Sequence, residues 1–165
     1  MLPRDAYFWA TLRIFMGLLF LWAFFDKVFG LGFATKAEAA WINGGSPTLG
    51  FLKFGTHGPF SSFYQSIAGQ PLVNWLFMLG LLGIGIAMTI GAGVKIAGWS
   101  GALMTLFMWT ALLPPANHPF LDEHILETIC LIGLAIHAAP SAGEVLGIGK
   151  WWKSTALVQK FTWLA

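Results

Sequence analysis

The sequence predicts an all-α fold: a polytopic membrane protein built as a four-transmembrane-helix bundle, with short interfacial or re-entrant helices in its first outer loop. Four apolar stretches of about 20 residues carry this prediction, because that length crosses ~30 Å of hydrocarbon as an α-helix. They cover residues 6–29, 71–90, 94–113 and 120–139. Lipid offers the backbone no hydrogen-bond partners, so each stretch must satisfy its own peptide groups as a helix.

The composition agrees with this class of protein. Apolar residues make up 57% of the 165 residues and charged residues 10%, whereas soluble domains carry about 25% charged residues. The net charge of +2 is too small to indicate a nucleic-acid partner. We expect one domain over residues 1–165, with the lipid bilayer as its first partner.

The first stretch, residues 6–29, is expected to remain in the protein as a membrane helix. It is too long for the core of a signal peptide, and no small-residue cleavage site follows it. Arg13 and Lys27 share one face of this helix. Arg13 lies roughly 10 Å from the nearer end by helical rise, so it either reaches toward the surface or finds a partner inside the bundle.

The segment at residues 30–70 is too long for a simple connection, and such loops usually are functional or hold structure of their own. Two patterns predict short helices in it. Thr35 followed by Glu38 is typical of a capping box, and Ser46-Pro47 is typical of an N-cap followed by the first helical residue. Helices of this length cannot span a bilayer, so we expect them at the outer interface.

The second and third stretches contain no acidic residue and are rich in glycine. The short connection between them makes them an antiparallel pair. Gly93, Ala97 and Gly101 are spaced four residues apart, a ridge of small residues that lets two helices approach closely. We therefore interpret these glycines as packing residues.

The fourth stretch carries the candidate catalytic residues. Pro119 suits the first turn of its helix, where Asp122 and Glu123 complement the helix dipole. Glu127 lies about two turns further in, roughly 9–10 Å below the outer end. A carboxylate inside a membrane is costly and marks a candidate functional site. Glu123 shares the face of Glu127, and His124 borders it.

Basic residues near the helix ends predict the orientation. With four spans, the N-terminus, the turn between the second and third spans and the tail at residues 140–165 share one side. That side carries five basic residues, against three on the other: Arg4, Lys95, Lys150, Lys153 and Lys160, against Lys27, Lys36 and Lys53. Because cytoplasmic loops carry the excess of basic residues, we expect a multi-pass protein of the cell (inner or plasma) membrane with both termini in the cytoplasm.

If the first and fourth helices are neighbours, their outer ends form one polar cluster over Glu127. Such a cluster relays protons, binds a polar head group, receives an anion, or only holds the helix ends together. The candidate catalytic residues are Glu127, His124, Glu123 and Asp122. The candidate residues for binding a substrate or quinone are Arg13, Asp26, Lys27, Trp22, Trp41, Lys53, His57 and His118.

The sequence argues against several cofactors. None of the four histidines lies in the first three stretches, so a pair of facing haem ligands is not expected. Cys130 is the single cysteine, which excludes an internal disulfide and a c-type haem site. The chain has no nucleotide, flavin or nicotinamide motif, and the spacing of His118 and His124 is not a recognised zinc signature. We predict no haem, flavin or metal, and a quinone as the candidate cofactor.

Three patches of the chain carry a resemblance to a known family. They are "LRIFMGLLFLWAFFDKVFG", "WINGGSPTLGFLKFGTHGPF", and "NHPFLDEHILE" with the closing "GLAIHAAPSAGEVLGIGKWW". In their order and spacing the chain resembles the DoxX-like membrane proteins, and within them the DoxD-type small subunit of thiosulfate:quinone oxidoreductase. The resemblance implies a four-helix membrane bundle. It also implies oxidation of thiosulfate to tetrathionate, with electrons passed to quinone, together with a second subunit.

These observations lead to two main functional hypotheses. In the first, the chain is a membrane subunit of a quinone-linked oxidoreductase, with the quinone ring near Trp22 and Trp41 and its protons supplied by His124, His57 or Glu127. In the second, it is a non-enzymatic scaffold, or a protein that binds a lipid or quinone. A small transporter is a third reading, and it requires a homo-oligomer because one four-helix copy leaves little room for alternating access.

Overall fold

The computed structural model describes residues 4–138 and 143–164, and all regular structure within them is helical. The main elements are α1 (Arg4–Phe29), α3 (Pro71–Ile90), α4 (Val94–Ala111) and α5 (Glu123–Gly133), which continues into the π-helical η4 (Leu134–Ala138). The shorter ones are η1 (Ala37–Ala39), η2 (Trp41–Asn43), η3 (Phe51–Gly55), α2 (Ser61–Ser66), α7 (Gly149–Ser154), α8 (Ala156–Lys160) and η5 (Thr162–Leu164). The all-α prediction is confirmed.

Two helices of the described residues are long and apolar enough to cross a membrane. They are Asp5–Phe29 and Pro71–Ile90, which correspond to the first and second predicted spans. Helix α4 occupies most of the third predicted stretch. Helix α5 with η4 covers residues 123–138 of the fourth. The third and fourth spans therefore stay predictions.

The start of α5 corrects one detail of the sequence interpretation. We expected this helix from residue 120 with Pro119 in its first turn, but it begins at Glu123. Asp122 is the N-cap: its backbone is extended, and its Oδ1 accepts a hydrogen bond from the backbone N–H of Ile125 at 3.1 Å. A capping carboxylate of this kind satisfies a free N–H of the first turn and so sets where the helix begins.

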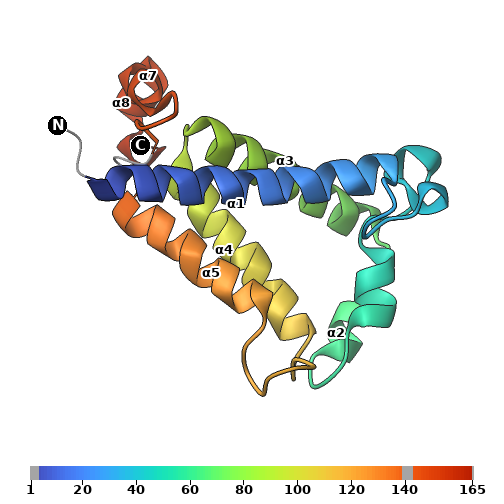
Figure 1. Ribbon diagram of the computed structural model, residues 1–165. Coiled ribbons are helices and arrows are strands. Elements are labelled where there is room, and N and C mark those ends of the chain that lie inside the picture. The colour runs from blue at the N-terminus through green and yellow to red at the C-terminus, as the bar shows by residue number, and fades with distance from the viewer. Residues whose placement is uncertain (1–3, 139–142, 165) are drawn as a thin grey trace.

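The four long helices are arranged as two pairs that diverge (Figure 1). Helix α1 runs along α3, and α4 runs along α5. The pairs are joined by the short turn between α3 and α4 and by the packing of these two helices, and α1 also contacts η4 of the second pair. Away from this junction α5 and α1 separate, so the outer ends of the two pairs lie apart (Figure 1).

Glycines allow close approach within each pair. A Cβ atom added at Gly17 of α1 would lie 2.6 Å from the backbone N of Thr89 in α3. One added at Gly98 of α4 would lie 2.8 Å from the carbonyl oxygen of Leu131 in α5. Gly101 of the predicted ridge also packs on Leu131, whereas Gly93 faces open space. The ridge therefore serves helix packing in α4, with Gly98 in place of Gly93.

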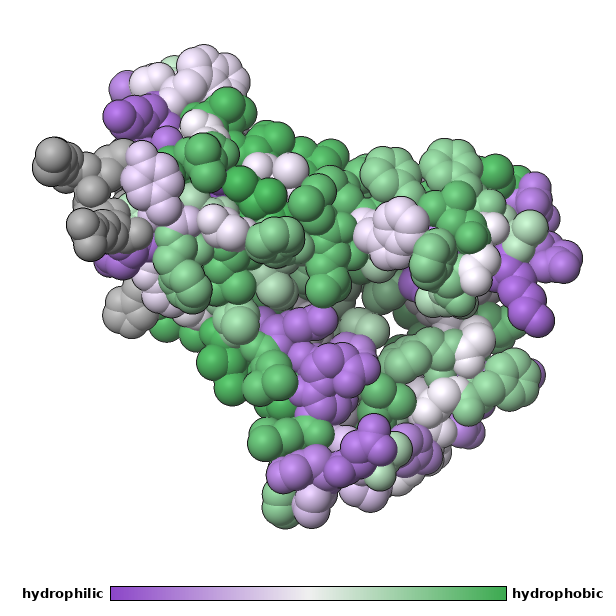
Figure 2. Space-filling model, viewed as in Figure 1, coloured by the Kyte–Doolittle hydropathy of each residue, from purple (hydrophilic) through white to green (hydrophobic). Residues whose placement is uncertain are grey.

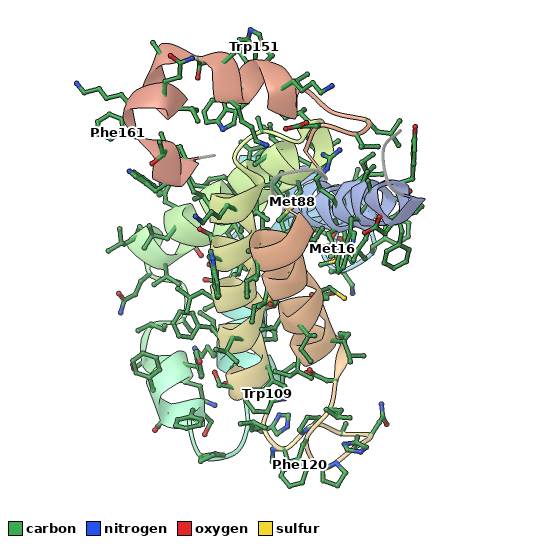
Figure 3. The ribbon with its side chains drawn as sticks, turned by 90° about the vertical axis from the view of Figure 1, so that its left-hand side faces the viewer. Met16, Met88, Trp109, Phe120, Trp151 and Phe161 are labelled. Atoms are coloured by element: carbon green, nitrogen blue, oxygen red, sulfur yellow. The ribbon has the colours of Figure 1, made fainter. Side chains whose placement is uncertain are left out.

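The core lies where the pairs meet, and large apolar side chains cover the outside. Met16 of α1 and Met88 of α3 lie in this core (Figure 3). The space-filling view shows apolar residues over most of the visible surface of α1 and its neighbours (Figure 2). Phe15 and Leu76 are each more than 60% exposed. A surface of this kind suits lipid rather than water.

The first outer loop contains the short helices that the sequence predicted, with different caps. Lys36, not Thr35, precedes η1, and no side-chain capping bond forms there. Ser46 instead binds Asn74 of α3, with its Oγ 3.0 Å from Oδ1. The Oγ of Thr48 lies 2.6 Å from the same oxygen. A buried amide in α3 therefore ties the loop to the bundle.

Arg13 is completely buried at the end where α1, α3 and the C-terminal segment meet. Its Nη1 donates to the carbonyl oxygens of Met88 and Thr89, in the last turn of α3. Its Nη2 donates to those of Val145 and Leu146, at 3.3 and 3.0 Å. The last carbonyls of a helix lack intrahelical partners and carry partial negative charge, so a guanidinium satisfies them well.

This placement gives Arg13 a structural role, and its place among the candidate substrate-binding residues stays a prediction. Its surroundings also explain two glycines. A Cβ atom at Gly91 would lie 3.1 Å from the guanidinium carbon, and one at Gly147 would lie 3.1 Å from Nη2. Any larger residue at either position would displace the guanidinium or the segment it binds.

We predict that Arg13→Leu lowers the free energy of unfolding by about 3 kcal/mol or more, because it leaves several buried carbonyls without a donor. Arg13→Lys should fall in between, since an ammonium cannot reproduce the planar fork of the guanidinium. The measurement is SDS-driven unfolding of the purified chain in mixed micelles. Lys36→Ala, at an exposed position, is the control. Wild-type stability in Arg13→Leu would contradict this role.

Candidate functional site

The start of α5 positions an acid–imidazole pair. The Nδ1 of His124 lies 3.0 Å from Oδ2 of Asp122, and both side chains are largely buried. The other oxygen of Asp122 caps the helix, so the carboxylate is fixed from two sides. A carboxylate at Nδ1 orients the ring and leaves Nε2 to exchange a proton with a ligand.

Two threonines fasten this part of α5 to α4. Thr128 donates its hydroxyl to the carbonyl oxygen of His124 at 2.8 Å, and its Oγ1 lies 2.7 Å from that of Thr105 in α4. Both threonines are buried. Neither threonine was among the candidate residues of the sequence. Their position in apolar stretches could have indicated this contact, because hydroxyl residues in an apolar helix often hydrogen-bond to a neighbouring helix.

Glu127 lies one turn beyond this pair and is half-buried. Among the residues that the structure describes, its carboxylate has neither a hydrogen-bond partner nor an ion-pair partner. The charged groups that act on it are His124, Glu123 and Asp122. A half-buried carboxylate next to an oriented imidazole is a suitable donor or acceptor of protons.

The outer part of α5 borders a hollow in the surface. Figure 2 shows hydrophilic residues along the outer part of α5, beside the hollow that separates α5 from α1. The hollow exists because the two helix pairs diverge toward this end (Figure 1). A ligand that enters from the side, between the helix pairs, would meet the polar face of α5.

Asp122, Glu123 and His124 also offer ligand atoms that all lie within 4.8 Å of one another. A cation held there would compete with two bonds that the structure already contains, the Asp122–His124 pair and the N-cap bond to Ile125. Glu123 is exposed. The donor set therefore suits a helix start better than a resident metal, and we keep the prediction of no metal.

His57 joins the first outer loop to the end of α4. Its Nε2 lies 3.0 Å from the carbonyl oxygen of Pro114, and its Nδ1 lies 3.2 Å from that of Gly55. Hydrogen bonds to the Pro114 and Gly55 carbonyls raise the pKa of His57 above its ordinary value, because only the imidazolium can donate from both nitrogens. The next residue, Gly58, packs closely against the segment that follows α4, because a Cβ atom at this position would collide with the carbonyl group of Leu113.

His118 stabilises the loop that leads into α5. Its Nδ1 accepts hydrogen bonds from the backbone N–H groups of Phe120 and Leu121, at 3.1 and 3.0 Å. Trp109 of α4 lies near Phe120 (Figure 3) and donates its Nε1–H to the carbonyl oxygen of Phe120 at 2.9 Å. His118 is therefore a residue of the loop before α5, and its Nδ1 is occupied.

The structure does not form the single polar cluster that the sequence suggested. Asp26 is buried and accepts hydrogen bonds from the backbone N–H groups of Phe33 and Ala34. Lys27 lies with its Nζ 5.9 Å from the ring centre of Phe77 in α3. Both belong to the α1–α3 pair, because α1 packs along α3 and its outer end diverges from α5 (Figure 1).

Trp22 and Trp41, the aromatic residues expected near the quinone ring, likewise pack away from α5. Trp22 contacts Phe33 edge-to-face at 5.0 Å, and Trp41 contacts Trp75 of α3 at 4.7 Å. Trp75 belongs to α3, so Trp41 also packs with the first helix pair. Lys53 is exposed on η3, with its Nζ 5.8 Å from the ring centre of Phe54.

Comparison with family models, with curated proteins and with solved structures gives no match. The resemblance to the DoxX-like proteins thus rests on the three sequence patches alone, and it contributes only to the proposal below.

We predict that the contact made by His57 weakens as pH rises. With a raised pKa in the folded state, its contribution is fully present below the ordinary histidine pKa of ~6.5 and is lost as pH rises through the folded value. Amide hydrogen exchange at residues 51–60, corrected for the intrinsic pH dependence, should be faster at high pH. His57→Gln should remove the pH dependence, whereas His118→Gln should retain it. Equal protection at both pH values would contradict the prediction.

Proposed function

We propose that this chain is a membrane subunit of a quinone-linked oxidoreductase, in which the polar face of α5 exchanges protons with a quinone bound in the hollow between α5 and α1. A thiosulfate:quinone oxidoreductase-like reaction is the specific form that the family resemblance suggests. The observation that carries the proposal is Glu127. It is a half-buried carboxylate without a partner among the described residues, next to the fixed Asp122–His124 pair on the helix that borders the hollow.

The proposal includes a four-span placement in the cell membrane with both termini in the cytoplasm. One structural observation supports it. The N-terminal part of α1, the α3–α4 turn and the C-terminal segment meet at one end: Ala6 and Ala10 pack with Val145, and the N–H of Ile148 donates to the carbonyl of Ile90. The basic residues at the ends of these elements thus gather on one side, as expected for a cytoplasmic face.

The chemistry required of α5 is proton transfer. Reduction of a quinone to the quinol takes two electrons and two protons, and oxidation of two thiosulfate ions to tetrathionate releases two electrons. The electrons come from that donor, held with the second subunit, and the protons reach the quinone oxygens through His124 and Glu127. His124 suits this role because an imidazole has two ring nitrogens, one of which can accept a proton while the other donates one.

In this proposal Lys53 and His57, the basic residues of the outer loop, attract the anionic electron donor. Lys53 and His57 are exposed, and the raised pKa of His57 favours its charged form. Lys27 does not take part, because it is half-buried against Phe77. Trp22 and Trp41 pack with the α1–α3 pair, so a contact of either ring with the quinone stays a prediction.

A scaffold or assembly subunit is the second candidate, and one observation favours it. The outer loop exposes large aromatic side chains: Phe54 is 77% exposed and Phe63 is 60% exposed. Clusters of exposed aromatic side chains are typical of surfaces that bind another protein. In this reading the polar face of α5 holds helix ends together and has no substrate.

We predict that Glu127→Gln lowers donor-dependent quinone reduction by about 100-fold, the scale of a general acid–base contribution. The assay uses membranes that contain the chain with its native partners. Glu38→Gln is the matched control, since it changes an exposed carboxylate of the loop at residues 30–70. Turnover unchanged in Glu127→Gln would refute the assignment. Lower turnover together with lower unfolding stability would favour the scaffold.

A separate measurement tests the quinone and the second subunit. The chain is purified gently from its native membrane and analysed by native mass spectrometry. We expect a retained quinone, a co-purifying redox subunit, or both. A chain that retains only bulk phospholipid and no partner would argue against the oxidoreductase.

A further inference from the structure

The C-terminal segment carries a surface that has no part in the proposed reaction. The segment consists of α7, α8 and η5 and lies across one end of the bundle, with Trp151 and Phe161 pointing away from the helices (Figure 3). Its large aromatic side chains are widely exposed, at 63% for Trp151 and 61% for Trp163. We call the surface formed by the exposed side chains of Lys150, Trp151, Leu157, Lys160, Phe161 and Trp163 the terminal surface.

The terminal surface is positively charged. Residues 145–165 contain three lysines and no acidic residue. One of them, Lys153, forms an ion pair with Glu144, the nearest carboxylate in sequence, at 2.6 Å. Lys150 and Lys160 are exposed, and neither has an ion-pair partner among the residues that the structure describes. The charges of these two lysines are therefore open to an anionic partner.

The exposed lysines lie beside the exposed aromatic rings. The Nζ of Lys160 is 5.6 Å from the ring centre of Phe161. Lys150 and Trp151 are consecutive residues of α7, and both side chains are exposed. A partner that covers the rings at either end of the segment is therefore also within reach of an ammonium group. Tryptophan next to lysine is typical of residues that lie at the level of lipid head groups.

Two hydrogen bonds fix the segment at the end of a helix that is long and apolar enough to cross a membrane. The N–H of Ile148, just before α7, donates to the carbonyl oxygen of Ile90 at 2.9 Å, and Ile90 is the last residue of α3. Trp152 donates its Nε1–H to the carbonyl oxygen of Leu164 at 2.9 Å, which joins α7 to η5. The segment thus lies where α3 would leave the hydrocarbon, and a surface held in place loses little entropy on binding.

We propose that the terminal surface binds the anionic head groups of the bilayer that contains the chain, with the exposed aromatic rings between the head groups and Lys150 and Lys160 on their negative charges. Short helices with exposed aromatic and basic side chains lie in the plane of the interface, and basic residues there attract anionic lipids. The inference rests on the membrane placement that forms part of the proposed function, but not on the hollow beside α5 or on quinone chemistry.

The test measures the depth of a spin label on the full chain in nanodiscs. The label is attached through Ser154→Cys in a Cys130→Ala background, since Ser154 is exposed and one helical turn from Lys150 and Trp151. The lipid is phosphatidylcholine alone or an equal mixture with phosphatidylglycerol, and electron paramagnetic resonance reports collisions with a water-soluble nickel chelate. We expect the ratio of shielded to accessible label to be higher in the mixture, by about fivefold for each lysine.

Two sets of variants separate the charges from the aromatic rings. Lys150→Ser combined with Lys160→Ser should remove the difference between the two lipids. The matched control is Lys36→Ser with Lys53→Ser, which removes the same charge from exposed positions of the outer loop and should keep the difference. Trp151→Ser combined with Trp163→Ser should make the label more accessible in both lipids, whereas Phe54→Ser, at a ring that is 77% exposed, should not.

Three results would overturn the proposal. A label that the nickel chelate reaches freely in both lipids would place the segment in water. Equal shielding in the two lipids, with both lysines present, would remove the preference for anionic head groups. Shielding that the tryptophan variant leaves unchanged would mean that protein, from this chain or a second copy, covers the terminal surface. None of these readouts depends on quinone turnover, so failure here is distinguishable from failure of the proposed function.

Discussion

The buried guanidinium of Arg13 is the constraint on which the arrangement of the helices depends. It binds the last turn of α3 and the segment before α7 at once, so it joins three parts of the chain that are distant in sequence. Its partners are carbonyl oxygens of helix and turn ends, which carry partial negative charge and would otherwise be buried without donors. Gly91 and Gly147 leave the space that this requires. One end of the molecule is thereby closed.

The other end is open for the same reason. The helix pairs are joined at the Arg13 end and diverge from it (Figure 1), so the outer part of α5 is left without a helix across its polar face. Asp122 and His124 fix each other there, Thr128 fastens the helix to α4, and Glu127 follows on the same helix, half-buried. An arrangement in which α1 packed along α5 would instead have covered this carboxylate.

The lengths of the apolar stretches predicted the long helices well, because a long apolar segment satisfies its backbone hydrogen bonds within itself only as a helix. Apolar length did not predict where α5 begins. Asp122 rather than Pro119 sets this start, because a side-chain cap adds a hydrogen bond, whereas a proline adds only a compatible backbone angle. The partners of Arg13 lie 75 to 133 residues away, and no local pattern points to them. The prediction of one outer polar cluster assumed that α1 and α5 are neighbours, but α1 packs along α3. Which helices pair depends on complementary surfaces, and sequence periodicity does not reveal these.

The Arg13 junction also has a consequence for biogenesis. A chain is made from its N-terminus, so α1 is synthesised before α3 and before the segment around Val145. The guanidinium must then stay hydrated until that segment arrives to complete its set of partners. Formation of α1 and closure of the bundle are therefore separate events in time.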